Sequence, residues 1–402
     1  MIFSIRPIFQ AYVLFFVAFF LFLAATNIQG GWLFVIDSLL ISLLVFSAIY
    51  PSIQSKKLLI SRKFKKSINE DELIEIEVIL ENTSNRTISF LGVEEEELIK
   101  KNNQVLKVNG KKFFISILSK EKKSFFYQIK PEVRGIYQFN NIKLVSDGPF
   151  GLFRYTKKIE IKDSLYVYPN VENLRNVDFL GNRNLGYKVS SRTKSAVDSS
   201  LPMNIRDYKR GDPTKLIHWK SVARTNKLMV KELETEQSLN VKIFIDTEKN
   251  KSFGIGRGNN FEYIIKASFA IFKFFYNKGF HTELVYFLDD KLKKIDNQKS
   301  DREINDTFTE IEALETKKFR EIINHDNLDK NSMNIIFFSD IEDEDIKILN
   351  DLYNLNYSIV PFFSKNNTFD DKIKDKTNIL KNCKYKFFEL EKGKKISDII
   401  YV

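Results

Sequence analysis

Two long apolar runs open the chain and dominate its pattern of hydrophobic and polar positions. They are IFQAYVLFFVAFFLFLAAT, residues 8–26, and GWLFVIDSLLISLLVFSAIY, residues 31–50. Each is close to the roughly 20 residues that a helix needs to cross the hydrocarbon core of a bilayer. The link between them, residues 27–31, is uncharged and short. The pattern therefore predicts a transmembrane helical hairpin within residues 1–55.

The positions of the charged residues predict the orientation of the hairpin in the membrane. Arg6 precedes the first run, the link has no charge, and six basic residues follow the second run before the first acidic one: Lys56, Lys57, Arg62, Lys63, Lys65 and Lys66. The positive-inside rule then predicts a multi-pass protein of the inner (cytoplasmic) membrane with its soluble part in the cytoplasm. A cleaved signal peptide is the alternative, and the second apolar run argues against it.

Asp37 lies inside the second apolar run. We expect it to reach toward water from the outer end of the helix. This interpretation is favoured because charge inside a membrane is costly. The alternative is a polar contact in a helical assembly, or a proton site.

From residue 56 to 168 the apolar residues recur with period two. ELIEIEVILEN alternates acidic and apolar positions, and further runs of this kind are separated by Gly, Asn, Lys or Pro. Several short strands at this spacing predict a β-sandwich-like module. The run VEEEELIK, residues 93–100, is interpreted as a solvated edge.

Strands and helices alternate in residues 241–402. NVKIFID and MNIIFFSD are apolar strands that end in Asp246 and Asp340, and NFEYIIKASFAIFKFFYNKG is an amphipathic helix between them. Such alternation predicts an α/β doubly wound, mostly parallel sheet. Ligands of these sheets bind at the carboxyl ends of the strands, where both aspartates fall.

Residues 169–240 connect the two modules and contain the densest cluster of charge. In RGDPTKLIHWKSVARTNKLMVKELE, residues 210–234, Gly211, Asp212 and Pro213 resemble a helix start with Asp212 as the N-cap. We expect a helix over residues 213–225, with Trp219 at the domain junction, followed by a strand.

DYKRGDPTKLIHWKSVARTNKLMVKELETE, residues 207–236, closely resembles the signature of the bacterial domain-of-unknown-function-58 (DUF58) family. The resemblance extends to DGPFGLFRYTKKIEIKDSLYVYPNV, residues 147–171, and to the paired N-terminal helices. It implies a multi-domain membrane protein whose C-terminal module is similar to the von Willebrand factor A domain. It also implies a MoxR-type AAA+ ATPase and a transglutaminase-like membrane protein as partners. No enzymatic activity is established for the family.

The same resemblance suggests a place to look for a metal. Von Willebrand A domains often bind Mg²⁺ through Asp-x-Ser-x-Ser after the first strand. Here Asp246 matches, and both serines are replaced, by Glu248 and Asn250. These two and Asp340 offer oxygen ligands, but Lys249 is an unfavourable neighbour, and Asp246 is expected only to cap the next turn. Mg²⁺ is the one candidate cofactor, and a metal-dependent hydrolase that uses these acids is the alternative function.

Three roles remain open for the signature residues, which are Arg206, Asp207, Tyr208, Gly211, Asp212, Pro213, Trp219, Lys220, Ala223 and Arg224. A charged brace between the flanking domains ranks first, because charged clusters are structural at least as often as catalytic. A docking surface for a partner ranks second. Catalysis by His218, Asp212 or Lys220 ranks third, because no nucleophile motif is present. We therefore predict a membrane-anchored adaptor without catalysis of its own.

Composition excludes other classes of protein. The single Cys383 forbids an intrachain disulfide, and three separated histidines do not make a zinc motif. The net charge is +11, and the densest basic cluster follows the second apolar run, where membrane topology and anionic lipid account for it. No nucleic-acid-binding module stands out, so we expect no nucleic-acid partner.

The charge pattern makes a topology prediction. A reporter fused after Val402 should show no periplasmic alkaline phosphatase activity, because the basic cluster retains the soluble part in the cytoplasm. Active phosphatase at this position would contradict the predicted orientation.

Overall fold

The computed structural model describes residues 3–28, 31–54, 57–95, 98–100, 105–106, 108, 110–175, 177, 202–209, 214, 217–233, 240–313, 316, 318–323, 327–370, 380, 383 and 385–400. The chain forms two compact units. One is Met1–Asn170 with Asp301–Glu312, and the other is Val171–Ser300 with Ala313–Val402.

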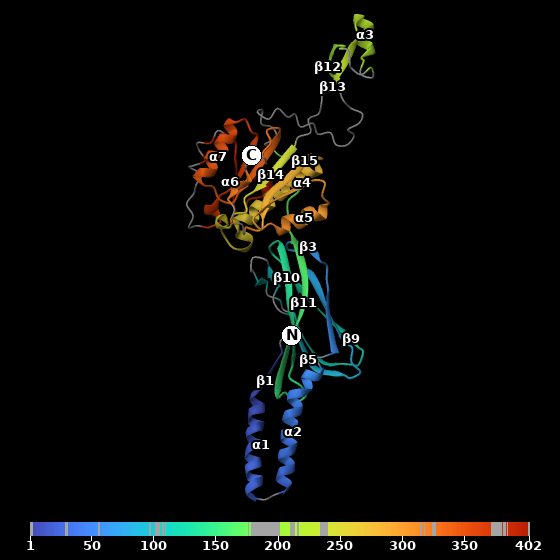
Figure 1. The fold of residues 1–402 in the computed structure, drawn as a ribbon, viewed down its shortest axis with the longest axis vertical. Helices are drawn as coiled ribbons and strands as arrows, with labels where there is room; N and C mark the ends of the chain where they lie inside the picture. The colour runs from blue at the N-terminus through green and yellow to red at the C-terminus, as the bar shows by residue number, and fades with distance from the viewer. Residues whose placement is uncertain are drawn as a thin grey trace. The chain divides into compact units, whose positions relative to one another are not determined.

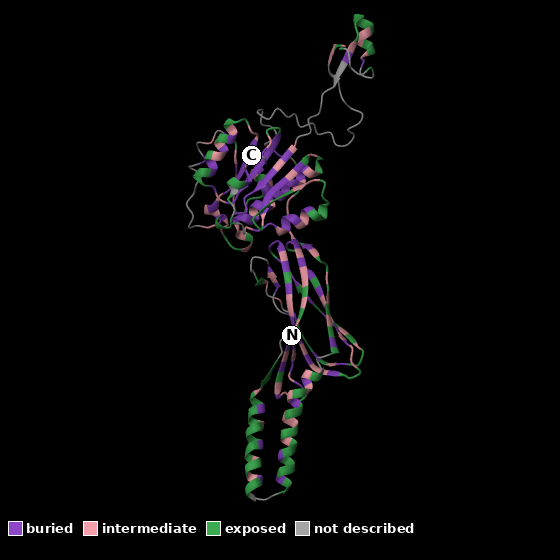
Figure 2. Cartoon of the chain, viewed as in Figure 1, coloured by how far each residue is buried: buried purple, intermediate pink, exposed green. Residues whose placement is uncertain are grey.

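Two apolar helices, α1 (Phe9–Ile28) and α2 (Gly31–Gln54), form the predicted hairpin (Figure 1). Both are long and apolar enough to cross a membrane. Three alanines spaced seven residues apart on α1 are buried, namely Ala11, Ala18 and Ala25, whereas most of the outer helix surface is exposed (Figure 2). Asp37 is also buried. The expectation that Asp37 reaches toward water is therefore wrong: the small side chains of α1 let the helices approach closely enough to enclose polar groups of α2.

Two sheets of the first unit enclose one core. The smaller sheet has the order β2 (Leu58–Lys63), β4 (Ile74–Asn82), β9 (Lys122–Ile129). The main strands of the larger sheet are, in order, β1 (Phe3–Pro7), β11 (Phe153–Tyr168), β10 (Gly135–Ser146), β5 (Ile88–Glu95) and β8 (Lys111–Ile117). Three short strands extend it, namely β3 (Ser67–Asn69) beside β11, β6 (Leu98–Lys100) beside β10, and β7 (Val105–Leu106) beside β6. On β4 the predicted alternation holds, and every second residue from Ile74 to Asn82 is buried. Apolar side chains of both sheets meet in this core, as in a sandwich.

Arg62 joins the two sheets through buried charge. It lies on β2, and its Nε is 3.1 Å from Oε1 of Glu95 on β5. Its Nη1 donates to the carbonyl oxygen of Ile161 on β11, at 2.8 Å. The side chains of Arg62 and Glu95 are both buried. Glu95 belongs to the run interpreted as a solvated edge, so that interpretation is wrong for this residue: the guanidinium compensates the buried carboxylate.

Helix α5 (Asp301–Glu310) belongs to the first unit, although its neighbours in the chain belong to the second. Nη1 of the fully buried Arg134 donates to the carbonyl oxygens of Phe308 and Thr309, at 2.8 and 3.3 Å. A cation at the carboxyl end of a helix satisfies its free carbonyls and complements its dipole. Tyr168 Oη donates to Asp306 Oδ1 at 2.7 Å. These contacts hold α5 against the larger sheet.

The second unit contains the predicted α/β sheet. Its strands, in spatial order, are β16 (Lys291–Asp296), β15 (His281–Leu288), β14 (Asn240–Ile245), β17 (Ser332–Phe338), β18 (Ile359–Ser364) and β19 (Phe388–Leu390). All neighbouring pairs are parallel except β15 with β16.

Helices cover this sheet. The buried residues of α6 (Phe319–Ile322) and α7 (Asp343–Asn354) share one core with alternate residues of β14 and β17. Helix α4 (Asn260–Asn277) packs on the same strands without joining that core, which places helices on both faces. The short α9 (Ile396–Ile400) follows β19 and packs beside it.

The signature segment contains a pair of strands and a short helix. Strand β12 (Pro202–Asp207) pairs antiparallel with β13 (Met229–Leu233), and the short helix α3 (Trp219–Thr225) lies between them in the chain.

The buried Arg62 makes a stability prediction. Arg62→Ala should lower the free energy of unfolding by roughly 3–5 kcal/mol, because it leaves Glu95 buried without its compensating charge. Thermal unfolding followed by circular dichroism on the full chain in detergent measures this. Lys162→Ala removes an exposed lysine that pairs with Glu160 and should change stability by about 0.5 kcal/mol or less. Arg62→Met combined with Glu95→Leu should recover most of the loss, and an unstable double variant would contradict the assignment.

Candidate functional site

The strand order locates the working edge of the α/β sheet. Counted from β14, the order is 3-2-1-4-5-6, and it reverses between β14 and β17. Ligands of doubly wound sheets bind outside the carboxyl ends of the strands at such a reversal. Asp246 directly follows β14 and is tied to the end of β17, since its backbone N–H donates to the carbonyl oxygen of Phe337 at 3.0 Å. The structure therefore places Asp246 at this crevice, as predicted.

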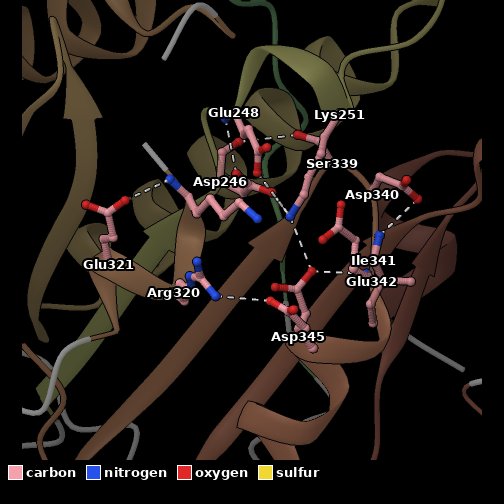
Figure 3. Close-up of polar contacts among 12 residues, drawn as sticks. Asp246, Glu248, Lys251, Arg320, Glu321, Ser339, Asp340, Ile341, Glu342 and Asp345 are labelled. Carbon is pink, nitrogen blue, oxygen red and sulfur yellow. Dashed lines mark hydrogen bonds and ion pairs between the residues drawn. The ribbon is translucent and has the colours of Figure 1, made fainter. Parts of the chain in front are cut away.

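A buried lysine occupies the crevice (Figure 3). Lys251 Nζ lies 3.3 Å from Asp246 Oδ2, 3.4 Å from Glu248 Oε2 and 3.2 Å from Asp345 Oδ2. The lysine belongs to a short 3₁₀ turn after β14, and Asp345 lies in the first turn of α7. The ammonium thus fills the position among the carboxylates that a bound cation would take.

Burial and charge act against each other in this cluster. Burial opposes the charge on Lys251, but the surrounding carboxylates outweigh it and raise the pKa of the ammonium above its ordinary value. Burial raises the pKa of Asp246 to about 7, against the lowering effect of Lys251 and of the Glu248 N–H. Three carboxylates around one ammonium leave excess negative charge, so the most buried of them holds its proton longest.

The four predicted metal ligands do not converge. Asp246 and Glu248 face Lys251, whereas Asn250 is exposed. Asp340 Oδ1 instead accepts hydrogen bonds from the backbone N–H of Ile341 at 2.9 Å and from Nδ2 of Asn366 at 2.7 Å. In the described part of the chain, no group of three or more His, Cys, Asp or Glu side chains is arranged to hold a metal ion. The donor set therefore does not fit Mg²⁺, and we derive no chemical step through a metal.

Three residues of this site were missed by sequence reasoning. Lys251 and Asp345 carry no motif, because their pairing depends on the approach of β14 to α7. Asn260, at the start of α4, is fully buried, and its Nδ2 lies 3.0 Å from the Lys251 carbonyl oxygen and 2.7 Å from that of Ser339. It joins the loops after β14 and β17, so the crevice is closed by polar contacts between loops.

The signature segment is organised differently from its prediction. Helix α3 begins at Trp219 with His218 at the N-cap, six residues later than expected. His218 N donates to the Met229 carbonyl oxygen at 2.9 Å, and Ile217 forms a bridge with Val230, so these residues pair with β13 and cannot be helical. The imidazole Nδ1 lies 2.7 Å from Ser221 Oγ, which gives His218 a local structural contact. Gly211, Asp212 and Pro213 lie outside the described residues.

The side chains of this segment are mostly exposed. Trp219 is 67% exposed, and no residue of α3 is buried. The Trp219 ring is therefore not buried against another described residue, and Trp219→Ala should not have the large cost of emptying a core position. Lys220, Ala223 and Arg224 are exposed, and neither of the two cations forms an ion pair with another described residue. Among the remaining signature residues, Asp207 is exposed, whereas Arg206 and Tyr208 are half-buried.

Comparison with known proteins gives a partial family match. The model of the family described as "Protein of unknown function DUF58" matches residues 204–332. The uncharacterized protein YeaD of Bacillus subtilis is 26% identical over 137 residues, which is 32% of this chain and 32% of the relative. The match thus spans about a third of the curated relative. The residues matched by the family model, 204–332, include α3, Asp246, Glu248 and Lys251, but not Asp340 or Asp345.

Solved structures show only distant likeness. The CARDB domain of a Pyrococcus furiosus protein, solved with di-metal ions, is 17% identical, with 27% of this chain and 91% of that chain covered and a TM-score of 0.20. The C-terminal domain of Wzt is 10% identical, with 29% and 75% covered and a TM-score of 0.21. Likeness at this level carries no argument about fold or function.

The lysine cluster makes a prediction about stability and its dependence on pH. Lys251→Met should lower the free energy of unfolding near neutral pH by roughly 3–5 kcal/mol, because it leaves buried carboxylates without their cation. In the variant the folded-state pKa of Asp246 lies further above its unfolded value, because the lowering effect of Lys251 is lost. The stability that Asp246 contributes is then present at low pH and lost as pH rises through its folded-state pKa.

The loss in free energy of unfolding caused by Lys251→Met, relative to the wild type, is therefore expected to be larger at about pH 8 than at about pH 5. Thermal unfolding of the full chain across this interval measures it. Lys249→Met, at the exposed neighbouring position, is the matched control and should change stability by about 0.5 kcal/mol or less. A deficit that is independent of pH would show that Lys251 acts through packing alone.

Proposed function

We propose that this protein is a membrane-anchored adaptor that binds a partner protein through the segment formed by β12, α3 and β13. The apolar hairpin holds the chain in the inner membrane as a multi-pass protein, and the soluble units lie in the cytoplasm. The partner is a MoxR-type AAA+ ATPase, as the family resemblance implies, and a transglutaminase-like membrane protein is a further candidate. The chain supplies binding surfaces and no chemistry of its own.

The exposed Trp219 is the observation that carries this proposal. Helix α3 has seven residues and buries none of them, and isolated helices of this length are marginal in water. A tryptophan that is 67% exposed on such a helix presents a large apolar surface. Tryptophan is enriched among the residues that dominate binding energy in protein interfaces. Docking therefore replaces the charged brace as the favoured role of the signature.

Charge specifies the kind of partner. Three exposed basic residues lie near the tryptophan in the sequence, namely Lys220, Arg224 and Lys227. None of them forms an ion pair with another described residue, and such cations can steer and orient an acidic partner. The proposed partner surface is an apolar pocket with an acidic rim.

The α/β unit fits the adaptor better than the alternative of a metal-dependent hydrolase. We propose that this unit is von Willebrand A-like, which its doubly wound sheet and the Asp246 at its first strand end support. At that strand end, the ammonium of Lys251 already pairs with Asp246 and Glu248, two of the acids that a hydrolase would need for a metal. The same contacts favour a rigid scaffold for presenting other surfaces.

Trp219→Ala tests the proposal. It should change the free energy of unfolding by about 0.5 kcal/mol or less, because the ring is exposed. It should also remove most of the ATPase recovered with the tagged full chain from detergent-solubilised membranes, with ATP present and absent. Ile255→Ala, which truncates an exposed apolar side chain of the α/β unit, should leave recovery unchanged. A variant that loses thermal stability but retains its partner would support the brace instead.

A further inference from the structure

We propose that the turn between β10 and β11, residues 147–152, is a third membrane-contacting element, which rests on lipid at the bilayer interface beside the two helices. This inference rests on the proposed membrane anchoring of the hairpin. The turn belongs to DGPFGLF, a motif that neither the adaptor surface nor the lysine cluster uses.

Contacts with α2 place the turn next to the apolar span of that helix. Gly148 has a φ of +66°, and a Cβ at this position would lie 3.4 Å from Pro51 Cγ and 3.8 Å from the Ser47 carbonyl oxygen. The ring of Phe150 contacts that of Phe46 with 6.4 Å between centroids. Phe46 lies within the apolar span Gly31–Ile53. The turn therefore lies beside the apolar part of α2, and not only beside its carboxyl end.

The other side of the turn is held by the start of α1. Ile8 N donates to the Leu152 carbonyl oxygen at 2.9 Å, and a Cβ on Gly151 would lie 3.9 Å from Gln10 Oε1. Both neighbours precede or open α1, so the turn lies where the two helices meet the sheet (Figure 1). Glycines at 148 and 151 permit the left-handed backbone and the close approach to the helices.

The turn still leaves apolar surface uncovered. Phe150 is 49% exposed despite its contact with Phe46, and Pro149 is exposed beside it. The neighbouring outer faces of α1 and α2 are also apolar and exposed. An aromatic ring at this level continues the lipid-facing surface of the hairpin, and amphipathic and aromatic side chains favour the membrane interface.

Charge next to the turn fits lipid headgroups. Arg6 on β1 lies directly opposite Arg154 on β11, and like charges in this position repel each other. Among the residues that the structure describes, Asp147 pairs with Arg154, with both donor-to-oxygen distances at 2.7 Å, while Arg6 is exposed. An anionic phosphate between the two arginines would relieve the repulsion. Anionic headgroups at the bilayer surface supply that phosphate.

Spin-label accessibility in lipid nanodiscs tests the inference on the full chain. In a Cys383→Ser background, nitroxides are placed through Phe150→Cys, Val45→Cys and Val105→Cys. Val45 lies on the exposed face of α2, and Val105, on β7, is 48% exposed and so matches Phe150. The ratio of oxygen to nickel-chelate accessibility should be several-fold higher at 150 and 45 than at 105. Phosphatidylglycerol in place of phosphatidylcholine should raise the ratio at 150, and Arg6→Gln should remove that increase.

The outcomes separate this inference from the membrane anchor. A high ratio at 45 with an aqueous ratio at 150 would overturn the inference and leave the anchor standing. Aqueous ratios at both positions would overturn the anchor and the inference together. A label at 150 shielded from both reagents would indicate a protein contact instead of lipid, and would also overturn it. Circular dichroism of each labelled variant confirms that the fold is retained.

Discussion

The attachment of the apolar hairpin to both sheets of the sandwich is the constraint on which the rest of the first unit depends. Strand β1 precedes α1 and pairs in the larger sheet, whereas β2 follows α2 and pairs in the smaller one. Packed sheets lie about 10 Å apart, and packed helices lie about 8–10 Å apart. These typical spacings are similar, so a pair of packed helices can continue from a pair of packed sheets. The β10–β11 turn contacts the hairpin through Phe150 and Phe46 and through the hydrogen bond from Ile8 N to the Leu152 carbonyl oxygen.

Within each unit, buried ion pairs join separate elements of the fold. Arg62 with Glu95 joins the two sheets, and Lys100 lies 3.2 Å from Glu312, just after α5. Lys251 joins loops of the α/β unit in the same way. In each case a cation from one element meets a carboxylate from another, and removing either partner would leave a costly uncompensated charge. In each described cluster a cation of the chain itself already lies beside the carboxylates.

The proposed function therefore depends on surfaces that are exposed in the described part of the chain. The signature segment uses its backbone for the β12–β13 pairing and leaves Trp219 exposed among cations. An adaptor needs a surface of this kind together with a rigid scaffold and an anchor. In the proposed adaptor role, different parts of one chain supply these features.

Local pattern alone determined the hairpin, the alternating strands such as β4, and the parallel α/β order, because each depends on a periodicity of apolar residues within one element. The start of α3 at Trp219 was not determined locally, because Ile217 and His218 pair with β13. The exposure of Trp219 and the burial of Glu95 depend equally on which elements come together. Only the tertiary structure brought Lys251 to Asp345, 94 residues later in the chain. A contact between distant residues has no local periodicity, so the fold decided that the carboxylates at the crevice surround an ammonium of the chain itself.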